Sequence, residues 1–427
     1  MVHELCKKCN TRKTDFNWCQ SCNAKYFQQN FKSWTSGNSD IDKLIQESQL
    51  NAKNKNEILE WIEYDKFKNV EYISKGGFGT IYKAIWSEGH ITNWNDKTNQ
   101  WDRHFDKWQE NIIALKSLNN SKDITFEFLN EIKSHLKLTN SKDIIGIYGI
   151  TKDPKTSDFM MVMKYATKGN LRQNINKFGW QRKLFTLRDI ARGLSYIHKE
   201  GLAHQDFHSG NILAYHSNHY NISDLGLCKP ANEKSKKVYG VLPYVAPEVL
   251  RGNEYTQESD IYGFGIILYE VINKLPPYYN MAHEEFLAIK ICQGLRPRFN
   301  IKIPQLIYDI YKQCVDADPL KRPTAEFLFE RFRQWSRNIL YDEKDSEMYK
   351  QVKEIDKFNE KQPKSSNNSD LTYITHSQAI YTSRLLNFNN LPEPKNADDE
   401  GEDDEDEYST SIEPIDFTKL NVNFQGK

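Results

Sequence analysis

The segment AHQDFHSGNILA at residues 203–214 constrains this chain more than any other stretch of its sequence. It carries Asp206 and Asn211, and the segment NISDLGL then places Asp224 directly after a short apolar run. A carboxylate at Asp206 can orient an attacking hydroxyl and accept its proton. Asn211 and Asp224 offer the hard oxygen ligands that Mg²⁺ prefers beside phosphate oxygens. The pattern therefore favours metal-assisted chemistry on a phosphate group.

Two segments nearer the N-terminus fit the same chemistry. The sequence ISKGGFGTIYKA at 73–84 predicts two strands joined by a turn, where Gly76 and Gly79 let backbone N–H groups approach phosphate oxygens. The apolar strand NIIALKSL carries Lys116, which needs an anionic partner in such surroundings. The amphipathic helix FLNEIKSHLKL supplies Glu131 as that partner. Three more motifs follow the catalytic segment: PYVAPEVL, SDIYGFGIILYEV and DADPLKRPT.

In their order and approximate spacing, these motifs resemble the eukaryotic protein kinase catalytic domain over residues 66–336, and most closely its tyrosine-kinase-like group. The resemblance implies an α+β, two-lobed kinase fold. The small lobe would hold a five-stranded sheet and one helix, and the large lobe would be mainly helical. ATP is then expected in the cleft between the lobes.

The resemblance also implies a role for individual residues. Asp206 would be the catalytic base, and Lys116 would hold the α- and β-phosphates while it pairs with Glu131. Asn211 and Asp224 would bind Mg²⁺ or Mn²⁺. The residues expected to contact the nucleotide are Ile73, Gly76, Gly79, Ile81, Ala114, Lys116, Met163, Lys164 and Ala166.

Three further expectations follow from the same resemblance. Met163 would be the gatekeeper before the interlobe hinge, and the backbone of Lys164 and Ala166 would read the adenine edge. Asp260 would brace the catalytic loop. Glu248 and Arg322 would form an ion pair in the core, with a structural role.

Several positions depart from the family pattern. Ser74 replaces the first glycine of the loop, and Leu225 replaces the phenylalanine of the Asp-Phe-Gly motif, a mild apolar exchange. Gln205 replaces an arginine that would pair with a phosphorylated activation-loop residue, and glutamine cannot form that charge-assisted pair. The hypothesis is that activation does not depend on phosphorylation of Ser235 or Tyr239.

The markers of acceptor class are also missing, because His208 stands where serine/threonine kinases carry a lysine and Val241 stands where they often carry a threonine. His208 is read either as a group that faces the γ-phosphate or as a solvated loop residue. The sequence thus indicates an ATP- and Mg²⁺-dependent kinase of protein hydroxyls in intracellular signalling, with serine or threonine favoured over tyrosine. The alternative is a pseudokinase scaffold that binds partners without phosphoryl transfer.

The first 25 residues read Cys6-x2-Cys9-x9-Cys19-x2-Cys22. Two Cys-x2-Cys knuckles with a short spacer form a four-thiolate tetrahedral site, so a structural Zn²⁺ is predicted. The alternative is a disordered head with free thiols. Basic residues flank the knuckles, but nucleic-acid binding is not expected, since small basic knuckles also bind proteins.

The rest of the chain divides by composition. Residues 26–65 are expected to be a linker with two short helices, around Ile41, Leu44 and Ile45 and around Ile58, Leu59 and Ile62. Residues 337–427 are expected to be a mostly disordered tail with an acidic run at 398–407.

Two segments within these divisions have alternative interpretations. The more apolar patch at 377–388 is read as part of the disordered tail, with a docking segment as the alternative. The insert at 85–111 carries Trp86, Trp94, Trp101 and Trp108. It is expected to be a hairpin whose indoles pack on the small lobe, with a protein-binding surface as the alternative.

Equal numbers of basic and acidic residues, 58 of each, conceal a basic body and an acidic tail. The first residues lack the apolar region of a signal peptide, Val2 excludes myristoylation, and no stretch is apolar enough to span a membrane. The expected location is cytoplasmic or nuclear. The expected partners are protein substrates and a protein bound by the head, the insert or the tail. Binding to a membrane is not expected.

Overall fold

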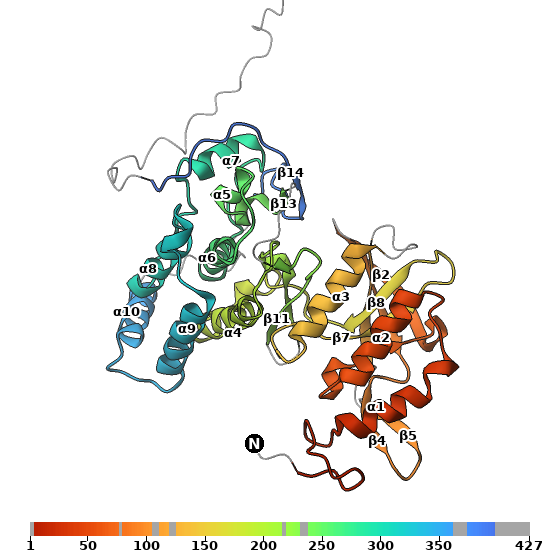
Figure 1. The fold of residues 1–427 in the computed structure, drawn as a ribbon. Helices are drawn as coiled ribbons and strands as arrows, with labels where there is room; N and C mark the ends of the chain where they lie inside the picture. Colours follow the sequence, from red (N-terminus) through yellow and green to blue (C-terminus); the bar gives the residue numbers. More distant parts are fainter. Residues whose placement is uncertain are drawn as a thin grey trace, which may run out of the picture.

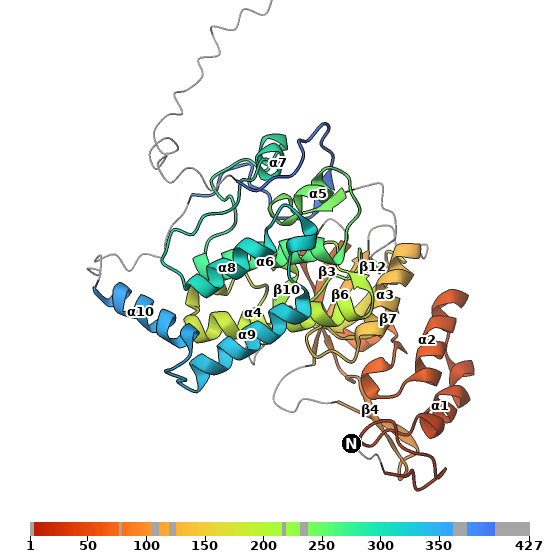
Figure 2. The same ribbon diagram turned by 60° about the vertical axis from the view of Figure 1, so that its left-hand side comes forward.

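The computed structural model describes residues 4–76, 79–104, 111–118, 125–215, 219–230, 238–361 and 374–397. Figures 1 and 2 show a small lobe built on a sheet and a large lobe built mainly of helices. The two-lobed α+β fold expected from the sequence is therefore confirmed.

Among the described residues, the sheet of the small lobe has six strands rather than the expected five. The extra strand is β1, which runs parallel to β7 and pairs Glu60 with Gly149. A Cβ atom on Gly149 would lie 2.2 Å from the Glu60 carbonyl oxygen, so this close approach needs glycine. In spatial order the strands are β1 (Glu60–Trp61), β7 (Ile147–Lys152), β8 (Phe159–Lys164), β6 (Ile112–Leu118), β3 (Gly79–Trp86) and β2 (Phe67–Lys75).

The second helix expected in the linker is not formed, and the strand β1 lies in its place. Leu59 packs in the core beneath the helices, whereas Ile62 packs with Phe67 in a separate core cluster of the sheet. Extended backbone sends successive side chains to opposite faces, and this segment follows that period rather than the helical one. A run of only five residues, Ile58 to Ile62, is too short for periodicity to distinguish the two structures.

The first expected linker helix is present as α2 (Ser39–Asn51), capped by the Asn38 side chain. Its Ile41 and Ile45 are fully buried against Phe128 of α3 (Phe126–Leu138), the helix that carries the active-site glutamate. The small lobe therefore has a second helix packed with α3. Residues 39–51 belong to the core and do not behave as a loose tether.

The hairpin in the insert is confirmed, as strands β4 (Ile91–Asn95) and β5 (Gln100–Arg103). Trp86 packs in the small lobe as expected. Trp101, however, stacks on Phe27 with ring centroids 4.3 Å apart, and Trp94 stacks on Tyr26 at 4.0 Å. Both partners belong to α1 (Gln20–Gln29), so the hairpin binds the Cys-rich head of its own chain.

This packing changes the expected boundary of the head. The boundary placed after residue 25 falls inside α1, which joins the head to what was expected to be a linker. Trp108 lies outside the described residues. A partly buried ion pair also anchors the hairpin, since Arg103 Nη2 lies 2.6 Å from Glu60 Oε2 on β1.

His90, beside this hairpin, gives the small lobe a pH dependence. Its ring stacks on Tyr148, with centroids 4.7 Å apart, and on His104. Burial disfavours the imidazolium and lowers the pKa of His90 to about 4, and the neighbouring His104 adds to this. Because the unfolded chain binds this proton more readily, the contribution of His90 is complete above about pH 6.5 and is lost toward pH 4.

We expect this loss to reach about 3 kcal/mol of unfolding free energy. Urea titrations of the wild-type protein and His90→Gln between pH 4 and 7.5 measure it. The stability difference between the two proteins should shrink as the pH falls. A difference that stays constant across this range would contradict the assignment.

The large lobe packs its helices around one extended apolar core. The helix α6 crosses this core with nearly every residue buried, and Thr256 and Ser259 form a capping box at its start. The helices are α4 (Trp180–Lys199), α5 (Pro247–Leu250), α6 (Gln257–Asn273), α7 (Glu285–Cys292), α8 (Gln305–Cys314), α9 (Ala325–Leu340) and α10 (Glu347–Lys361). Short strands complete the lobe: β9 (Leu202–Ala203), β10 (Ile212–Ala214), β11 (Tyr220–Ile222), β12 (Lys229–Pro230), β13 (Val238–Gly240) and β14 (Arg384–Leu386).

The region after residue 336 is more ordered than its composition suggested. The helix α9 continues to Leu340, and α10 follows it. Residues 374–397 lie along the large lobe, where β14 pairs with β13 (Figure 1). The interpretation of 377–388 as disordered is therefore wrong, and the docking alternative is correct. The acidic run at 398–407 lies outside the described residues.

Candidate active site and cysteine cluster

Lys116 connects the two lobes through two carboxylates. Strand β6 presents its ammonium group, which donates to Glu131 Oε1 of α3 at 2.6 Å and to Asp224 Oδ1 at 2.8 Å. Lys116 is 5% exposed and Glu131 is fully buried, so solvent screens the pair little. The expected ion pair is present, and the same ammonium also reaches the expected metal ligand.

The charges of this triad depend on one another. Burial disfavours every charged form, but the Asp224 and Glu131 carboxylates outweigh it and raise the pKa of Lys116. The Lys116 charge similarly outweighs burial at Asp224 and lowers the pKa of that carboxyl group. At Glu131 burial prevails over Lys116 and raises the pKa. The site therefore holds a permanent cation beside an ionised Asp224.

The catalytic loop is held by Asp260, as expected. Its carboxylate accepts the backbone N–H of His204 at 2.7 Å and of Gln205 at 3.1 Å. Gln205 has a φ of +68°, and these two bonds stabilise that left-handed turn. The turn places Asp206 at 4% exposure, with Asn211 Nδ2 3.0 Å from its carbonyl oxygen.

His208 is 5% exposed, so the interpretation of a solvated loop residue is wrong. Its Nδ1 accepts the Gly210 N–H at 3.1 Å and stabilises the turn before Asn211. Its Nε2 lies 3.6 Å from Asp206 Oδ2. A Cβ on residue 210 would lie 2.7 Å from the His208 ring, so glycine is needed there.

The expected nucleotide-contact residues lie on β2, β3, β6 and β8 and in the segment after β8. In the glycine-rich turn, Gly76 N–H donates to the Gly79 carbonyl at 2.8 Å. Strand pairing aligns Ile81 with Lys116, and Ala114 with Met163. Ile73 on β2 is 43% exposed.

In the hinge, the Lys164 N–H already donates to Gly146, and the Ala166 carbonyl accepts from Gly169. Elsewhere in the large lobe, the structural ion pair expected for the core is also present. Both Arg322 terminal nitrogens donate to the Glu248 carboxylate, at 2.7 and 2.8 Å.

One residue at the site was not selected from the sequence. Ser383 Oγ donates to Asp206 Oδ2 at 2.6 Å and lies 3.3 Å from His208 Nε2. It comes from the docked segment 374–397. The sequence signal was the apolar character of 377–388, which suggested docking but not the place where the segment docks.

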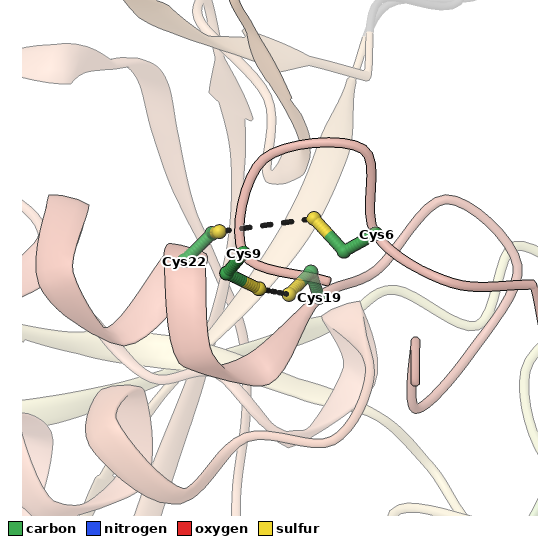
Figure 3. Close-up of side chains that lie close together, drawn as sticks. All are labelled: Cys6, Cys9, Cys19 and Cys22. Atoms are coloured by element: carbon green, nitrogen blue, oxygen red, sulfur yellow. Dashed lines mark hydrogen bonds between the residues drawn. The ribbon is translucent and has the colours of Figure 1, made fainter. Parts of the chain in front are cut away.

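The four N-terminal cysteines form a second candidate site, separate from the first. Their sulfur atoms all lie within 4.8 Å of one another, and Cys6–Cys22 and Cys9–Cys19 are 3.8 and 3.4 Å apart (Figure 3). A tetrahedral site with Zn–S bonds of about 2.3 Å has sulfur atoms about 3.8 Å apart. None of the four is in a disulfide. The cluster therefore has the geometry of a four-thiolate metal site.

The thiols are also electrostatically suited to a cation. Backbone N–H groups of Cys9 and Lys8 lower the pKa of Cys6, and the Thr11 hydroxyl and N–H lower that of Cys9 to about 6. Burial and the neighbouring thiols instead raise the pKa of Cys22. A bound dication would supply the charge that lets all four ionise together.

The two lobes and the triad between them define the protein kinase fold. A family model described as protein tyrosine and serine/threonine kinase matches residues 67–332, and the chain belongs to this family.

Curated relatives agree with this family. The chain is 30% identical over 286 residues to ankyrin repeat-containing protein kinase A of Dictyostelium discoideum, a match covering 62% of this chain and 18% of that protein. It is 29% identical over 289 residues to serine/threonine-protein kinase VIK of Arabidopsis thaliana, covering 63% of this chain and 60% of that protein. The matches thus span only part of these relatives.

None of the helices in the described part of the chain is both long and apolar enough to cross a membrane.

Proposed function

We propose that this protein transfers the γ-phosphoryl group of ATP to serine or threonine hydroxyls of proteins. The observation that carries the proposal is the bridge from Lys116 to Glu131 and Asp224 beside a braced Asp206. The serine/threonine acceptor is supported by relatives that are named as serine/threonine kinases, such as the kinase VIK. The tyrosine-kinase-like subgroup rests on the motifs alone.

The charged residues of the site would have separate roles in binding phosphate, binding metal and accepting a proton. Lys116 would hold the α- and β-phosphates, and Glu131 would keep its ammonium in place. Asn211 and Asp224 would hold Mg²⁺ or Mn²⁺, which neutralises charge on the phosphates when bound. Asp206 would orient the acceptor hydroxyl and take its proton. Positioning and electrostatics thus account for the rate.

We also propose that Cys6, Cys9, Cys19 and Cys22 hold a structural Zn²⁺. The compact sulfur cluster supports this, together with the aromatic packing of α1 on the hairpin β4–β5. All four positions of the tetrahedron are filled by thiolates, so such a site would be structural rather than catalytic.

The competing function is a pseudokinase scaffold. Assays of the full-length protein with radiolabelled ATP, Mg²⁺ and casein or myelin basic protein distinguish the two, with Asp206→Asn beside the wild type. We expect label on serine or threonine that is lost in the variant. Equal labelling in both proteins, or label on tyrosine alone, would contradict the proposal. No transfer under any condition would favour the scaffold.

A further inference from the structure

The segment 374–397 is anchored to the large lobe on both sides of Ser383. Before it, the Tyr381 hydroxyl donates to the Pro277 carbonyl at 2.9 Å, and its ring lies 4.1 Å from the Arg172 guanidinium. After it, Leu386 and Leu391 are buried in the core of the large lobe. These contacts span the segment, so its position does not depend on the Ser383 hydrogen bond.

The middle of the segment adds a strand next to the catalytic loop. In β14, Arg384 pairs with Gly240, Leu385 with Tyr239, and Leu386 with Val238 in an antiparallel ladder. The partner strand β13 ends directly before Val241 and the Ala-Pro-Glu motif. Extended peptides that add a strand in this way gain affinity from backbone bonds and specificity from alternate side chains. Leu386 is 5% exposed and Leu385 is 50% exposed, which fits that alternation.

Ser383, directly before β14, lies with its hydroxyl at the Asp206 carboxylate. Ser383 Oγ donates to Asp206 Oδ2 at 2.6 Å. Asn211 Nδ2 lies 3.3 Å from the same carboxylate oxygen. A general base must lie within hydrogen-bond reach of the proton it removes, and Asp206 meets this condition for Ser383.

We propose that residues 374–397 occupy the protein-substrate groove of their own chain, and that Ser383 is phosphorylated there in cis. The proposal rests on the proposed kinase function. Ser383 Oγ forms a bond to the γ-phosphorus of ATP as the bond to the β,γ-bridging oxygen breaks, and ADP leaves. The hydroxyl proton passes to Asp206 and then to solvent.

The same placement makes the segment an inhibitor until it reacts. While Ser383 holds Asp206 Oδ2, the hydroxyl of another protein substrate cannot take the same place. A phosphate on Ser383 adds about −1.5 to −2 charge and removes the donated hydrogen bond. Beside the Asp206 carboxylate this phosphate repels the segment from the groove. Phosphorylation of Ser383 therefore opens the site to other protein substrates.

The first test follows phosphate on Ser383. Dephosphorylated full-length protein is given ATP and Mg²⁺, and the modified residue is identified by mass spectrometry over a hundredfold dilution series. We expect a rate constant that does not change with protein concentration. Ser383→Ala should remove this phosphate, while Thr382→Ala, at the exposed neighbouring hydroxyl, should keep it. A rate proportional to protein concentration would overturn the cis assignment.

The second test measures competition for the groove. In the Ser383→Ala background, where the segment cannot be phosphorylated, Leu386→Asp should release the segment, whereas Leu385→Asp, at the exposed neighbour, should not. If the segment occupies about 90% of molecules, its release lowers the KM for myelin basic protein about tenfold. Tyr381→Ala removes a different anchor and should also lower this KM. It replaces Leu386→Asp in the test if that variant folds poorly.

The outcomes separate this proposal from the kinase function. Transfer to myelin basic protein without phosphate on Ser383, or with the same KM in all variants, overturns the cis substrate alone. Loss of all transfer, including transfer by the Leu386→Asp variant, overturns both.

Discussion

Loss of the zinc site is expected to unfold the N-terminal head and release the hairpin β4–β5. Structural zinc sites in small domains contribute about 10–16 kcal/mol to folding at neutral pH. Here the metal would hold Cys19 at the start of α1, whose Phe27 packs on Trp101 of the hairpin. Trp18, 2% exposed, bonds to the Ala52 carbonyl and would lose its place as well. The apolar cluster around Trp18 and Phe27 is small, so we expect the metal to supply much of the stability of the head.

The measurement combines metal content with local structure. Elemental analysis should give one zinc per wild-type chain and none in Cys19→Ser. Limited proteolysis and tryptophan fluorescence should show residues 4–29 exposed after chelation, with the large lobe still folded. As a control, the Cys292→Ala variant loses a buried thiol of the large lobe and should still contain one zinc per chain. A Cys19→Ser protein with an intact, protease-resistant head would contradict the site.

The residues of the candidate active site could be selected from the sequence because short motifs carry them, and the structure brings them together. Asp206 and Asn211 lie on one loop, and the turn between them is stabilised locally by His208 and Gly210. The kinase pattern also supplies the Lys116–Glu131 pairing, because the residues lie on adjacent elements. In such cases local spacing determines the geometry, so the residues could be named without a structure.

The remaining features depend on contacts between distant parts of the chain. The insert at 85–111 was expected to be a hairpin, but nothing near Trp94 identifies Tyr26 as its partner. Likewise, Ser383 and Asp206 lie 177 residues apart in the sequence. The strand β14, which directly follows Ser383, has only three residues, too few for any alternation to be read. Such contacts become visible only once the fold is known.

Replacement of Lys116 by methionine is expected to lower γ-phosphoryl transfer by about 10²–10³-fold, the usual cost of losing one electrostatic contact to the transition state. The ammonium is the only group described between Glu131 and Asp224 that donates to both carboxylates. Without it, two carboxylates remain in a buried site with no cation, and one of them must take up a proton at neutral pH. Breaking a buried ion pair in this way costs about 3–5 kcal/mol of stability as well.

Loss of stability and loss of catalysis can be separated with a double variant. In Lys116→Met/Glu131→Gln the orphaned charge at residue 131 is gone, so the unfolding free energy should recover by about 2 kcal/mol relative to Lys116→Met. Phosphoryl transfer should not recover, because no cation is left for the phosphates. Urea titrations and initial rates on the full-length proteins, with Ser383 phosphate as a second readout, give both quantities. If Lys116→Met retained transfer within a factor of about ten, Lys116 would serve only to position α3.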